Sequence, residues 1–598
     1  MLKIAGAALN QTPLDWKNNI NNILSAINKA KQQQVELLCL PELCITGYGC
    51  EDLFLSDWIY DKAITILFEE IVPETEGIAV IIGLPIRLNN NNFNCACFIN
   101  DKKVIGFYPK EFLAKDGIHY EPRWFEAWKP YRKQLIRINN EAYQFGEYLF
   151  EVKGIKIGIE ICEDAWHSEE RPAIRYWQKE VDIIVNPSAS HFSFGKTQLR
   201  KELVINSSKK YNCTYVYANL VGNEAGRVIY DGEILIANKG ELIARNQLLS
   251  FQSSHLLTNT SPSIAIDYSQ EEEFERAAGL GLFDYLRKSK TSSFVLSLSG
   301  GADSSACASL VYLMVQNASK ELGENIVKKL LAIPPNTTSI LPHLLHTAYQ
   351  GSKNSSTKTL EAASQLAASF DATFYHWQIT AQVADSIKII EKAIGRELTW
   401  QNDDIALQNI QARERSPLIW LLANIKKGLL LTTSNRSEGN VGCATMDGDT
   451  SGSIAPIAGV DKPFIRHWLR WAEKERDLKG LHAVNTLEPT AELRPQDQKQ
   501  SDEDDLMPYD ILKAIERLAI QKYHSPQEVF TLLKEEHLTT DEALKTYIKK
   551  FFRMWSHNQW KRERLAPSFH LDDFNIDPRS WYRFPILSGS YAEELNAL

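Results

Sequence analysis

The sequence predicts an α/β protein of two domains, and three observations carry that prediction. Short β-rich runs alternate with amphipathic helices from the N-terminus to about residue 246, which is typical of stacked α and β layers. From about 247 to 269 the periodicity is lost and Ser, Thr and Pro accumulate, as in a linker. Alternation then resumes in the pattern of a parallel sheet. We therefore place a first domain at residues 1–250, a linker at 251–270 and a second domain at 271–598.

The first domain is predicted from one long helix and a series of short strands. The helix covers about residues 16–33. The predicted strands are, in chain order, "LKIAGAALN", "ELLCLPE", "AVIIGLPI", "CACFIN", "IKIGIEIC", "DIIVNPS", "TYVYANLVG" and "ILIANKGELIA".

The second domain begins with a predicted helix at about 270–288, which leads into the strand of "SFVLSLSGGADSS". The runs "LLAIPP", "TFYHWQI" and "GLLLTTSN" are predicted as further strands of a parallel sheet. Past about residue 505 the chain is expected to be mainly helical. The acidic stretch "QKQSDEDD" at 498–505 is predicted as a loop, either a solvated surface turn or a functional segment.

Composition excludes several classes of protein. Of the 598 residues, 44% are hydrophobic and 24% are charged, which are ordinary globular values. The net charge of -9 argues against binding to duplex nucleic acid, which needs a basic face, although "KRER" at 561–564 is locally basic. Small anionic ligands remain compatible with this balance.

The cysteines and the apolar runs indicate a cytoplasmic protein without a membrane segment. Nine cysteines are scattered without paired CxxC spacings, which argues against a disulfide framework or a structural zinc site. The start, "MLKIAGAALNQ", reads as a first strand rather than a secretion signal. The run "IAVIIGLPI" at 78–86 is too short to cross a bilayer.

Three side chains of the first domain suit nucleophilic catalysis. Glu42 follows a buried strand, Lys110 follows another, and the alternation in "IKIGIEICEDAW" leaves Cys162 at a strand's end. A thiol attacks only as thiolate, so it needs a nearby base and a cation that stabilises the charge developing on a carbonyl oxygen. Taken singly, a buried cysteine usually belongs to a core and a lysine after a strand usually lies on the surface.

Together and in this order, the three residues resemble the Glu-Lys-Cys triad of the nitrilase (carbon-nitrogen hydrolase) superfamily over roughly residues 1–250. The resemblance implies a nitrilase-like α-β-β-α sandwich that acts as a glutaminase and cleaves amides through a thioester. Glu42, Lys110 and Cys162 would be catalytic. Glu121 would be the second active-site glutamate.

The segment "NPSASHFSFGK" at 186–196 carries the predicted glutamine contacts. Its "FGKT" end looks like a phosphate-binding loop, but Ser190 stands where that loop requires glycine. Within the nitrilase resemblance, Ser190 and Lys196 would instead hold the glutamine substrate. Asp116 stands where the family often has an aromatic residue near bound glutamine, which implies a different local contact.

The central stretch "SGGADSS" at 299–305 predicts a phosphate site. A strand that runs into a glycine-rich turn and then a helix points backbone amides and a helix N-terminus at an anion. No lysine follows the glycines, so the Walker pattern is absent. The stretch resembles the SGGxDS loop of the ATP pyrophosphatase family. The resemblance implies a Rossmann-like parallel sheet, bound ATP and adenylated intermediates.

Further segments of the second domain resemble those of NAD synthetases. They are "NSSTKTLEAASQLA" at 354–367, "NIQARERSPLIWLLAN" at 409–424, "LLLTTSNRSEGNVGCATMDGD" at 429–449 and "EPTAELRPQDQKQSDEDDLMPYDIL" at 488–512. With the first domain included, nearly the whole chain resembles the glutamine-dependent NAD synthetase family. Ser434, in place of the middle glycine of a TGN segment, and Cys443, in place of a common tyrosine, depart from the family and imply altered local contacts.

The resemblance assigns ligand contacts residue by residue. Magnesium would be held by Asp303 and Glu438, two acids of the kind that this ion prefers. ATP would be bound by Ser299, Gly300, Gly301, Asp303, Ser304, Thr433 and Lys462. Deamido-NAD would be bound by Asn409, Arg413, Glu438, Thr445, Asp449 and Lys561. Apart from the resemblance, the sequence favours surface charges as the interpretation of Arg413 and Lys561.

The reaction implied is the amidation of deamido-NAD to NAD, with ATP forming an adenylate and glutamine, or free ammonia, supplying nitrogen. We expect a homo-oligomer that binds these small molecules, with no nucleic acid or membrane partner. One alternative is another amidotransferase built on the same ATP loop, which the NIQAR and TAELRP segments disfavour. A second is a catalytically inactive assembly or regulatory protein, which would have lost site residues that are all present here.

Overall fold

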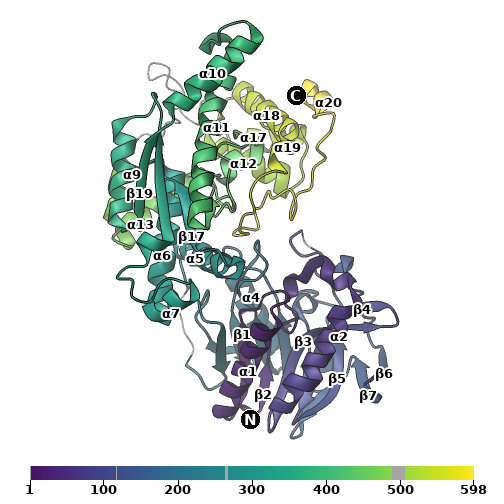
Figure 1. Ribbon diagram of the computed structural model, residues 1–598. Coiled ribbons are helices and arrows are strands. Elements are labelled where there is room, and N and C mark those ends of the chain that lie inside the picture. Colours follow the sequence, from purple (N-terminus) through teal and green to yellow (C-terminus); the bar gives the residue numbers. More distant parts are fainter. Residues whose placement is uncertain (1, 116, 263–266, 488–505) are drawn as a thin grey trace. The chain divides into compact units, whose positions relative to one another are not determined.

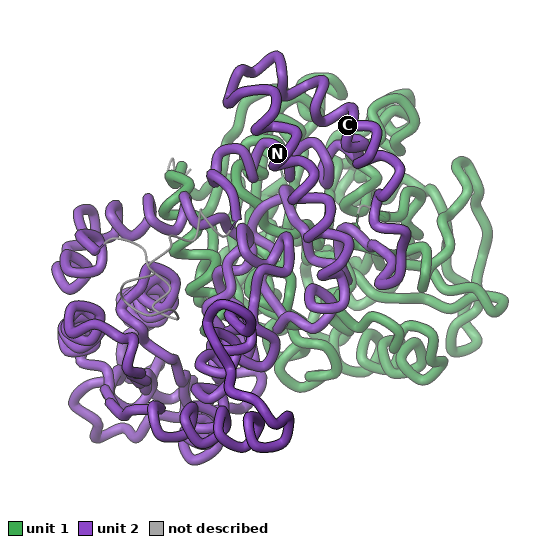
Figure 2. The backbone as a smooth tube through the Cα atoms, turned by 90° about the horizontal axis from the view of Figure 1, so that it is seen from above, with its two compact units in different colours: residues 1–284 green, residues 285–598 purple. Residues whose placement is uncertain are grey.

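The computed structural model describes residues 2–115, 117–262, 267–487 and 506–598. The chain forms two compact units, residues 1–284 and 285–598 (Figure 2). The division falls inside helix α5, Gln270–Ser289, close to where the sequence predicts a helix. Asp116 and the acidic stretch at 498–505 lie outside the described residues. None of the helices that the described residues form has the length and apolar content that a membrane crossing requires.

The first unit contains two large sheets. One has the strands β1 (Ile4–Leu9), β2 (Leu37–Cys39), β3 (Ala79–Leu88), β4 (Asn91–Asn100), β5 (Lys103–Pro109), β6 (Lys133–Ile138), β7 (Glu141–Gly146) and β16 (Ser254–Thr258). They are arranged in the order β16-β1-β2-β3-β4-β5-β7-β6. The other has β8 (Phe150–Val152), β9 (Ile155–Ile159), β10 (Ile183–Ser188), β11 (Thr214–Asn219), β14 (Ile234–Asn238) and β15 (Glu241–Arg245). Their order is β15-β14-β11-β10-β9-β8. Strands β12 (Val221–Asn223) and β13 (Ile229–Asp231) form a separate pair.

The two sheets pack face to face with helices on their outer faces. Strand β1 lies against β11 and β14, so closely that a Cβ on Gly6 would come within 2.6 Å of Ile234 Cγ2. Helices α1 (Trp16–Gln32) and α2 (Asp57–Ile66) cover the first sheet (Figure 1). Helices α3 (Pro172–Trp177) and α4 (Lys196–Lys210) pack on strands of the second sheet. The α-β-β-α sandwich expected from the sequence is confirmed.

Part of the predicted linker is a strand instead. Residues Ser254–Thr258 form β16, which pairs antiparallel with β1 from Ala5↔Thr258 to Leu9↔Ser254. The Ser and Thr content of this segment suggested irregular backbone. The unpaired edge of β1 supplies backbone partners that local composition does not reveal.

The second unit is built on a four-stranded parallel sheet. Its strands are β17 (Ser293–Ser297), β18 (Leu345–Gly351), β19 (Thr373–Gln378) and β20 (Gly428–Leu431), in the order β19-β18-β17-β20. Helices α6 (Ala302–Leu322) and α9 (Thr357–Ser369) pack on strands of this sheet, and α11 (Trp400–Lys426) packs on β17 and β20 (Figure 1). The parallel sheet that the sequence predicts is confirmed.

One predicted strand of this unit is wrong. The run "LLAIPP" lies at the end of α7 (Glu324–Leu330) and in the loop that follows, because two adjacent prolines cannot donate to a sheet. The sheet uses β18 instead. All seven of its residues are buried, but His346, Thr347 and Gln350 hide the apolar pattern of a buried strand.

The C-terminal segment is mainly helical from Tyr509 to Arg562. Helices α16 (Tyr509–Glu516), α17 (Pro526–Lys534) and α18 (Asp541–His557) share an apolar core that includes Phe551 and Trp555. Helix α19 (Gln559–Arg562) follows α18. Residues 563–591, all of them described, then follow an irregular path to the short helix α20 (Ala592–Ala597).

Candidate active sites

The first candidate site lies where strands β2, β5 and β9 end. Glu42 follows β2, Lys110 follows β5 directly, and Cys162 opens the 3-10 helix η5 (Cys162–Trp166) shortly after β9. The loop of Glu42 runs against Gly83 of β3, where a Cβ would lie 2.2 Å from the backbone nitrogen of Leu43. Glycine at position 83 therefore leaves room for the loop that carries the Glu42 carboxylate.

A buried ammonium ion joins two carboxylates at this site. Lys110 Nζ lies 2.7 Å from Glu42 Oε1 and 2.8 Å from Glu121 Oε1, and the three side chains are at most 1% exposed. Asn94 Nδ2 donates to Glu42 Oε1 (2.7 Å), and the backbone nitrogen of Ala189 donates to Glu42 Oε2 (2.9 Å). The structure thus brings together residues that are up to 79 positions apart, from Glu42 to Glu121.

Glu121 is fixed by two further hydrogen bonds. The hydroxyl of Tyr48 donates to its Oε1 (2.7 Å), and the backbone nitrogen of Ala114 donates to its Oε2 (3.0 Å). Because both of its carboxylate oxygens already accept hydrogen bonds, Glu121 is suited to holding Lys110 in place rather than to transferring protons. Glu42 differs from Glu121 in its role. Burial raises the pKa of Glu42 to about 7, although the charge of Lys110 acts to lower it. A carboxyl with that pKa can accept and return a proton near neutral pH.

Cys162 stands at a strained turn. Its φ of 42° lies in the left-handed region that non-glycine residues rarely adopt, so the side chain projects from a sharp strand-to-helix bend. Burial raises the pKa of its thiol, and the charge of Glu42 raises it further, while Lys110 opposes both. The thiol is therefore protonated at rest and needs a base before it can attack.

The predicted glutamine-binding residues lie in the loop after β10 and at the start of α4. Ser190 donates its backbone N–H to Asn219 Oδ1 and its carbonyl accepts from Asn219 Nδ2, at 2.9 and 2.8 Å. Lys196 Nζ lies 2.8 Å from His191 Nε2. The sequence predictions missed Arg200, which is fully buried and bonds the side chain and carbonyl of Ser190. Its i,i+4 spacing from Lys196 on α4 could have indicated a shared helix face.

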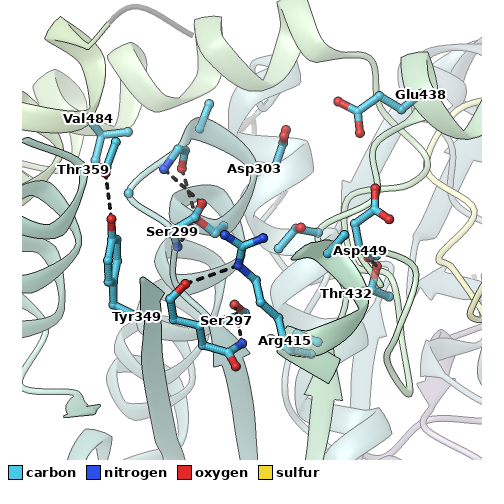
Figure 3. A pocket seen from close by; sticks show the side chains of 18 of the residues that line it. Ser297, Ser299, Asp303, Tyr349, Thr359, Arg415, Thr432, Glu438, Asp449 and Val484 are labelled. Carbon is cyan, nitrogen blue, oxygen red and sulfur yellow. Dashed lines mark hydrogen bonds between the residues drawn. The ribbon is translucent and has the colours of Figure 1, made fainter. Parts of the chain in front are cut away.

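The second candidate site is a cavity of about 350 Å³ at the carboxyl ends of β17, β18 and β20 (Figure 3). This is the edge at which parallel sheets of this kind bind ligands. Gly300 has a φ of 81°, and a Cβ there would lie 2.3 Å from the carbonyl oxygen of Thr359, so the turn requires glycine. The predicted residues that line this cavity are Ser299, Gly300, Gly301, Asp303, Ser304, Thr433, Glu438, Asp449 and Lys462.

Two acids and a lysine face one another in the cavity. Lys462 Nζ forms an ion pair with Asp303 and lies 3.6 Å from Glu438 Oε1. Both acids lie in the upper part of the view in Figure 3, Asp303 near its centre and Glu438 to the right. Asn435 Nδ2 also donates to Asp303 Oδ1, at 3.4 Å. The carboxylates thus already share one cation, and carboxylate oxygens are among the ligands that Mg²⁺ prefers.

The remaining predicted dinucleotide residues gather around the loop 444–449. Thr445 Oγ1 donates to Asn409 Oδ1 (2.6 Å), and its backbone nitrogen donates to Asp449 Oδ1 (2.7 Å). Arg413 Nε donates to the carbonyl of Met446 and Lys561 Nζ to the carbonyl of Ala444. Burial raises the pKa of Asp449 to about 6, while the hydrogen bond from Thr445 opposes the rise.

Ser434 and Cys443, the two residues of this unit that depart from the family pattern, make ordinary local contacts. Ser434 Oγ lies 3.0 Å from Thr432 Oγ1 and its backbone nitrogen donates to the same oxygen. Cys443 is half-buried against the apolar core of the C-terminal helices.

Sequence reasoning also missed residues that line the cavity. Arg415 donates from Nε to the carbonyl of Gln350 at 3.3 Å, and Gln350 Nε2 donates to Ser297 Oγ at 3.1 Å (Figure 3). Arg415 lies two positions after Arg413 within "NIQARER". The strand β18, which was not predicted, carries Tyr349 and Gln350 into the cavity wall.

Comparison with known proteins agrees with this division of chemistry. Residues 3–251 match the carbon-nitrogen hydrolase family model and residues 276–564 match the NAD synthase model. The chain therefore joins an amide-cleaving unit of the nitrilase type to a nucleotide-binding synthase unit.

Relatives that match nearly the whole chain identify its family more closely. A crystal structure of a glutamine-dependent NAD(+) synthetase from Cytophaga hutchinsonii is 51% identical, with a TM-score of 0.91 over 100% of this chain and 99% of that chain. The curated glutamine-dependent NAD(+) synthetase of Homo sapiens is 28% identical over 98% of this chain and 95% of its own length. A glutamine-dependent NAD+ synthetase from Acinetobacter baumannii, solved with ADP, shares the fold at 22% identity and a TM-score of 0.69. This chain belongs to the family of glutamine-dependent NAD(+) synthetases.

Proposed function

We infer that this chain amidates deamido-NAD to NAD, with ATP activating the carboxylate and glutamine supplying the nitrogen. The observation that carries the inference is the presence of two different sites in one chain of this family. An amide forms from a carboxylate only when a good leaving group and a nitrogen nucleophile are both provided. The glycine-lined cavity suits the first task and the Glu42-Lys110-Cys162 group suits the second.

In the glutaminase step, Glu42 takes the proton of Cys162 and the thiolate attacks the carboxamide carbon of glutamine. Lys110 stabilises the negative charge that develops on the carbonyl oxygen. Ammonia leaves, with Glu42 returning the proton, and water then hydrolyses the glutamyl thioester. Glu121 holds Lys110 in place through its 2.8 Å ion pair.

Glutamine is held during this step by Ser190 and Lys196. Ser190 is anchored by Asn219 and Arg200, which is the kind of support that keeps a substrate contact in one position. The Lys196 ammonium supplies positive charge suited to a carboxylate of the amino-acid substrate.

In the synthetase step, the nicotinate carboxylate of deamido-NAD attacks the α-phosphorus of ATP and pyrophosphate leaves. Ammonia then attacks the adenylated carboxyl carbon and AMP leaves, which completes the amide. The turn before α6 offers backbone amides to the phosphates. The residues assigned to ATP are Ser299, Gly300, Gly301, Asp303, Ser304, Thr433 and Lys462, and those assigned to deamido-NAD are Asn409, Arg413, Glu438, Thr445, Asp449 and Lys561.

A magnesium ion fits beside Asp303 and Glu438. This fit is supported by Lys462, whose ammonium group already lies near both carboxylates. The position therefore favours positive charge. When bound, Mg²⁺ would neutralise the pyrophosphate that departs. Asp303 and Glu438 would contribute the protein oxygens and phosphates the others.

The domain boundaries and compartment follow the sequence predictions. We propose a glutaminase domain at 1–250, a connecting segment at 251–270, of which Ser254–Thr258 pairs with the first sheet, and a synthetase domain at 271–598, in a cytoplasmic protein. All nine cysteines are free, which is ordinary for a reducing compartment.

We propose that the protein is a homo-oligomer. Helix α10 (Thr380–Ile394) buries only Val383 among its residues, and its Ile389 is 67% exposed. On α11, Ile405 is 73% and Ile425 66% exposed. Ile390 and Ile394 of α10 are each 50% exposed as well, so the last turns of this helix leave neighbouring apolar side chains uncovered, as on a surface that another chain covers. Light scattering would give the number of copies.

The assignment is tested by measuring NAD formed from deamido-NAD and ATP, with glutamine or ammonium offered separately. We expect product with each donor, and AMP and pyrophosphate as by-products. Failure with both donors would overturn the function. Product with ATP and a different carboxylate acceptor, but none with deamido-NAD, would favour another amidotransferase.

A further inference from the structure

Asp164 lies two residues after Cys162, and no step of the proposed reaction uses it. Its side chain is fully buried. Each carboxylate oxygen accepts two hydrogen bonds: Oδ1 from the backbone nitrogens of Glu111 (3.0 Å) and Phe112 (2.8 Å), and Oδ2 from the Tyr108 hydroxyl (2.9 Å) and the backbone nitrogen of Ile161 (2.8 Å). Four acceptor positions are all that a carboxylate offers, so the group is fully used.

The four donors belong to the two segments that carry the proposed catalytic ammonium and thiol. Tyr108, Glu111 and Phe112 flank Lys110 along the chain, and Ile161 directly precedes Cys162. One carboxylate therefore ties the loop after β5 to the turn after β9. These segments are separated by about 50 residues of sequence and share no strand pairing, because β5 and β9 belong to different sheets.

The two ends of the lysine are held by different groups. Glu42 and Glu121 bond the Nζ atom, whereas Asp164 holds the backbone on either side of Lys110. On the cysteine side, the bond to Ile161 anchors the residue before the strained φ of Cys162. In a dry interior such charge-assisted bonds are strong. Burial raises the pKa of Asp164 to about 7, and the bond from Ile161 opposes that rise.

We propose that Asp164 is a positioning residue that fixes the Lys110 ammonium relative to the Cys162 sulfur. The proposal rests on the catalytic roles inferred above for those two residues. Asp164 sets how well the developing oxyanion meets the ammonium, so it governs the rate of thioester formation. It makes no bond to Ser190 or Lys196 in the structure, so the binding of glutamine does not depend on it.

The test uses Asp164→Asn in the full-length protein. The amide keeps the shape of the side chain, but its NH₂ group cannot accept, so two of the four bonds are lost. We expect kcat for glutamate release to fall by about 10- to 100-fold, the cost of misplacing reacting groups by roughly 1 Å. KM for glutamine should change by less than about twofold, since only transition-state interactions are lost. Ammonium-driven NAD synthesis should be unchanged.

A graded variant and a matched control accompany it. Tyr108→Phe removes one of the four bonds, so kcat should fall in the same direction but by only about threefold to tenfold, the cost of one hydrogen bond. Glu160→Gln is the control, because Glu160 is equally buried beside the same turn but bonds Arg171 and the backbone of Ala173 instead. Its kcat for glutamate release should stay within about twofold of the parent protein.

The outcomes separate this proposal from the proposed function. An unchanged kcat for Asp164→Asn, a rise in KM alone, or an equal loss in Glu160→Gln would overturn the positioning role. If Asp164→Asn does not fold, Tyr108→Phe decides, and an unchanged kcat there overturns the role. Cys162→Ala is measured alongside: glutamine-driven synthesis that survives in it would refute the catalytic assignment itself, whatever Asp164 does.

Discussion

The two sites of this chain are built in opposite ways. In the glutaminase unit, Glu42 and Lys110 are fully buried and joined at 2.7 Å, and hydrogen bonds fix them before any substrate arrives. In the synthetase unit, the Asp303 and Glu438 side chains are 17% and 24% exposed around a cavity of about 350 Å³. The first site must supply every charge to one small amide. The second must leave room for two nucleotides whose phosphates bring charges of their own.

The different construction of the two sites predicts different kinetics for their variants. Because the glutaminase group is a closed unit, removing one member should abolish one nitrogen source and leave the other. Because the synthetase cavity serves the step common to both sources, changes there should affect glutamine and ammonium alike, in proportion to the charge removed.

The largest effect is expected from Cys162→Ala, which removes the proposed nucleophile. Glutamine-driven synthesis should fall on the order of 10⁶-fold, the scale on which loss of a nucleophile acts. Ammonium-driven synthesis should persist, because thiol to methyl is a small volume change. Both rates are measured on one preparation at a pH that supplies free ammonia.

The matched control for this prediction is Cys213→Ala, which changes a buried cysteine away from the site. It should retain both activities. Glutamine-driven synthesis that survives in Cys162→Ala would remove this residue from the mechanism, and loss of both activities would indicate a structural role.

The next largest effect is expected from Asp303→Ala. Losing a carboxylate proposed to hold the Mg²⁺ that neutralises the pyrophosphate should lower NAD formation by roughly 10³-fold, since such charge stabilisation is worth several kcal/mol. Both nitrogen donors should be affected equally. An ammonium-driven rate close to the original would contradict the assignment, and Asp510→Ala, an exposed acid on α16, should be unaffected.

Glu438→Gln should have a milder effect of the same kind. The amide keeps one oxygen for a cation but loses the negative charge. The Mg²⁺ concentration that gives half-maximal rate should rise at least about tenfold, the smallest cost typical of a lost outer partner of a metal. A titration of activity against Mg²⁺ measures this, and an unshifted curve would place Glu438 outside the metal site.

The fold was predictable where local pattern and tertiary environment agree. Strands such as β3 and β11 are mostly apolar and buried over most or all of their length, and both predictions are confirmed. Strand β18 escaped prediction because its burial depends on neighbours, since "LHTAYQG" reads as polar. Strand β16 was not predicted because it forms by pairing with the free edge of β1. No local sequence pattern reveals such a partner.

The same limit applies to the sites. Glu42, Lys110 and Cys162 could be selected because each follows an apolar strand and matches a familiar order. Asp164 was visible only as a neighbour of Cys162, and Asn94 had no signal at all. Asn94 of β4 reaches Glu42 after β2 of the same sheet, whereas Asp164 bonds the loop after β5 of the other sheet. Both contacts are set by how the strands pack, which local sequence does not show.

The smallest effect is expected from Arg200→Lys, and it sharpens the view that the glutaminase site is fixed in advance. Arg200 forms an ion pair with Asp231 and bonds the Ser190 side chain at 3.2 Å. Lysine keeps the positive charge but has no planar fork to serve both partners. We expect KM for glutamine to rise about fivefold, the value of roughly one hydrogen bond, with kcat and the ammonium-driven rate nearly unchanged. Arg171→Lys is the control, since Arg171 is buried in the same unit but bonds Glu160, and its KM should not move. If kcat fell instead while KM stayed constant, Arg200 would be acting on the Cys162 chemistry rather than on the substrate, and the division between a fixed catalytic group and a separately held glutamine would have to be abandoned.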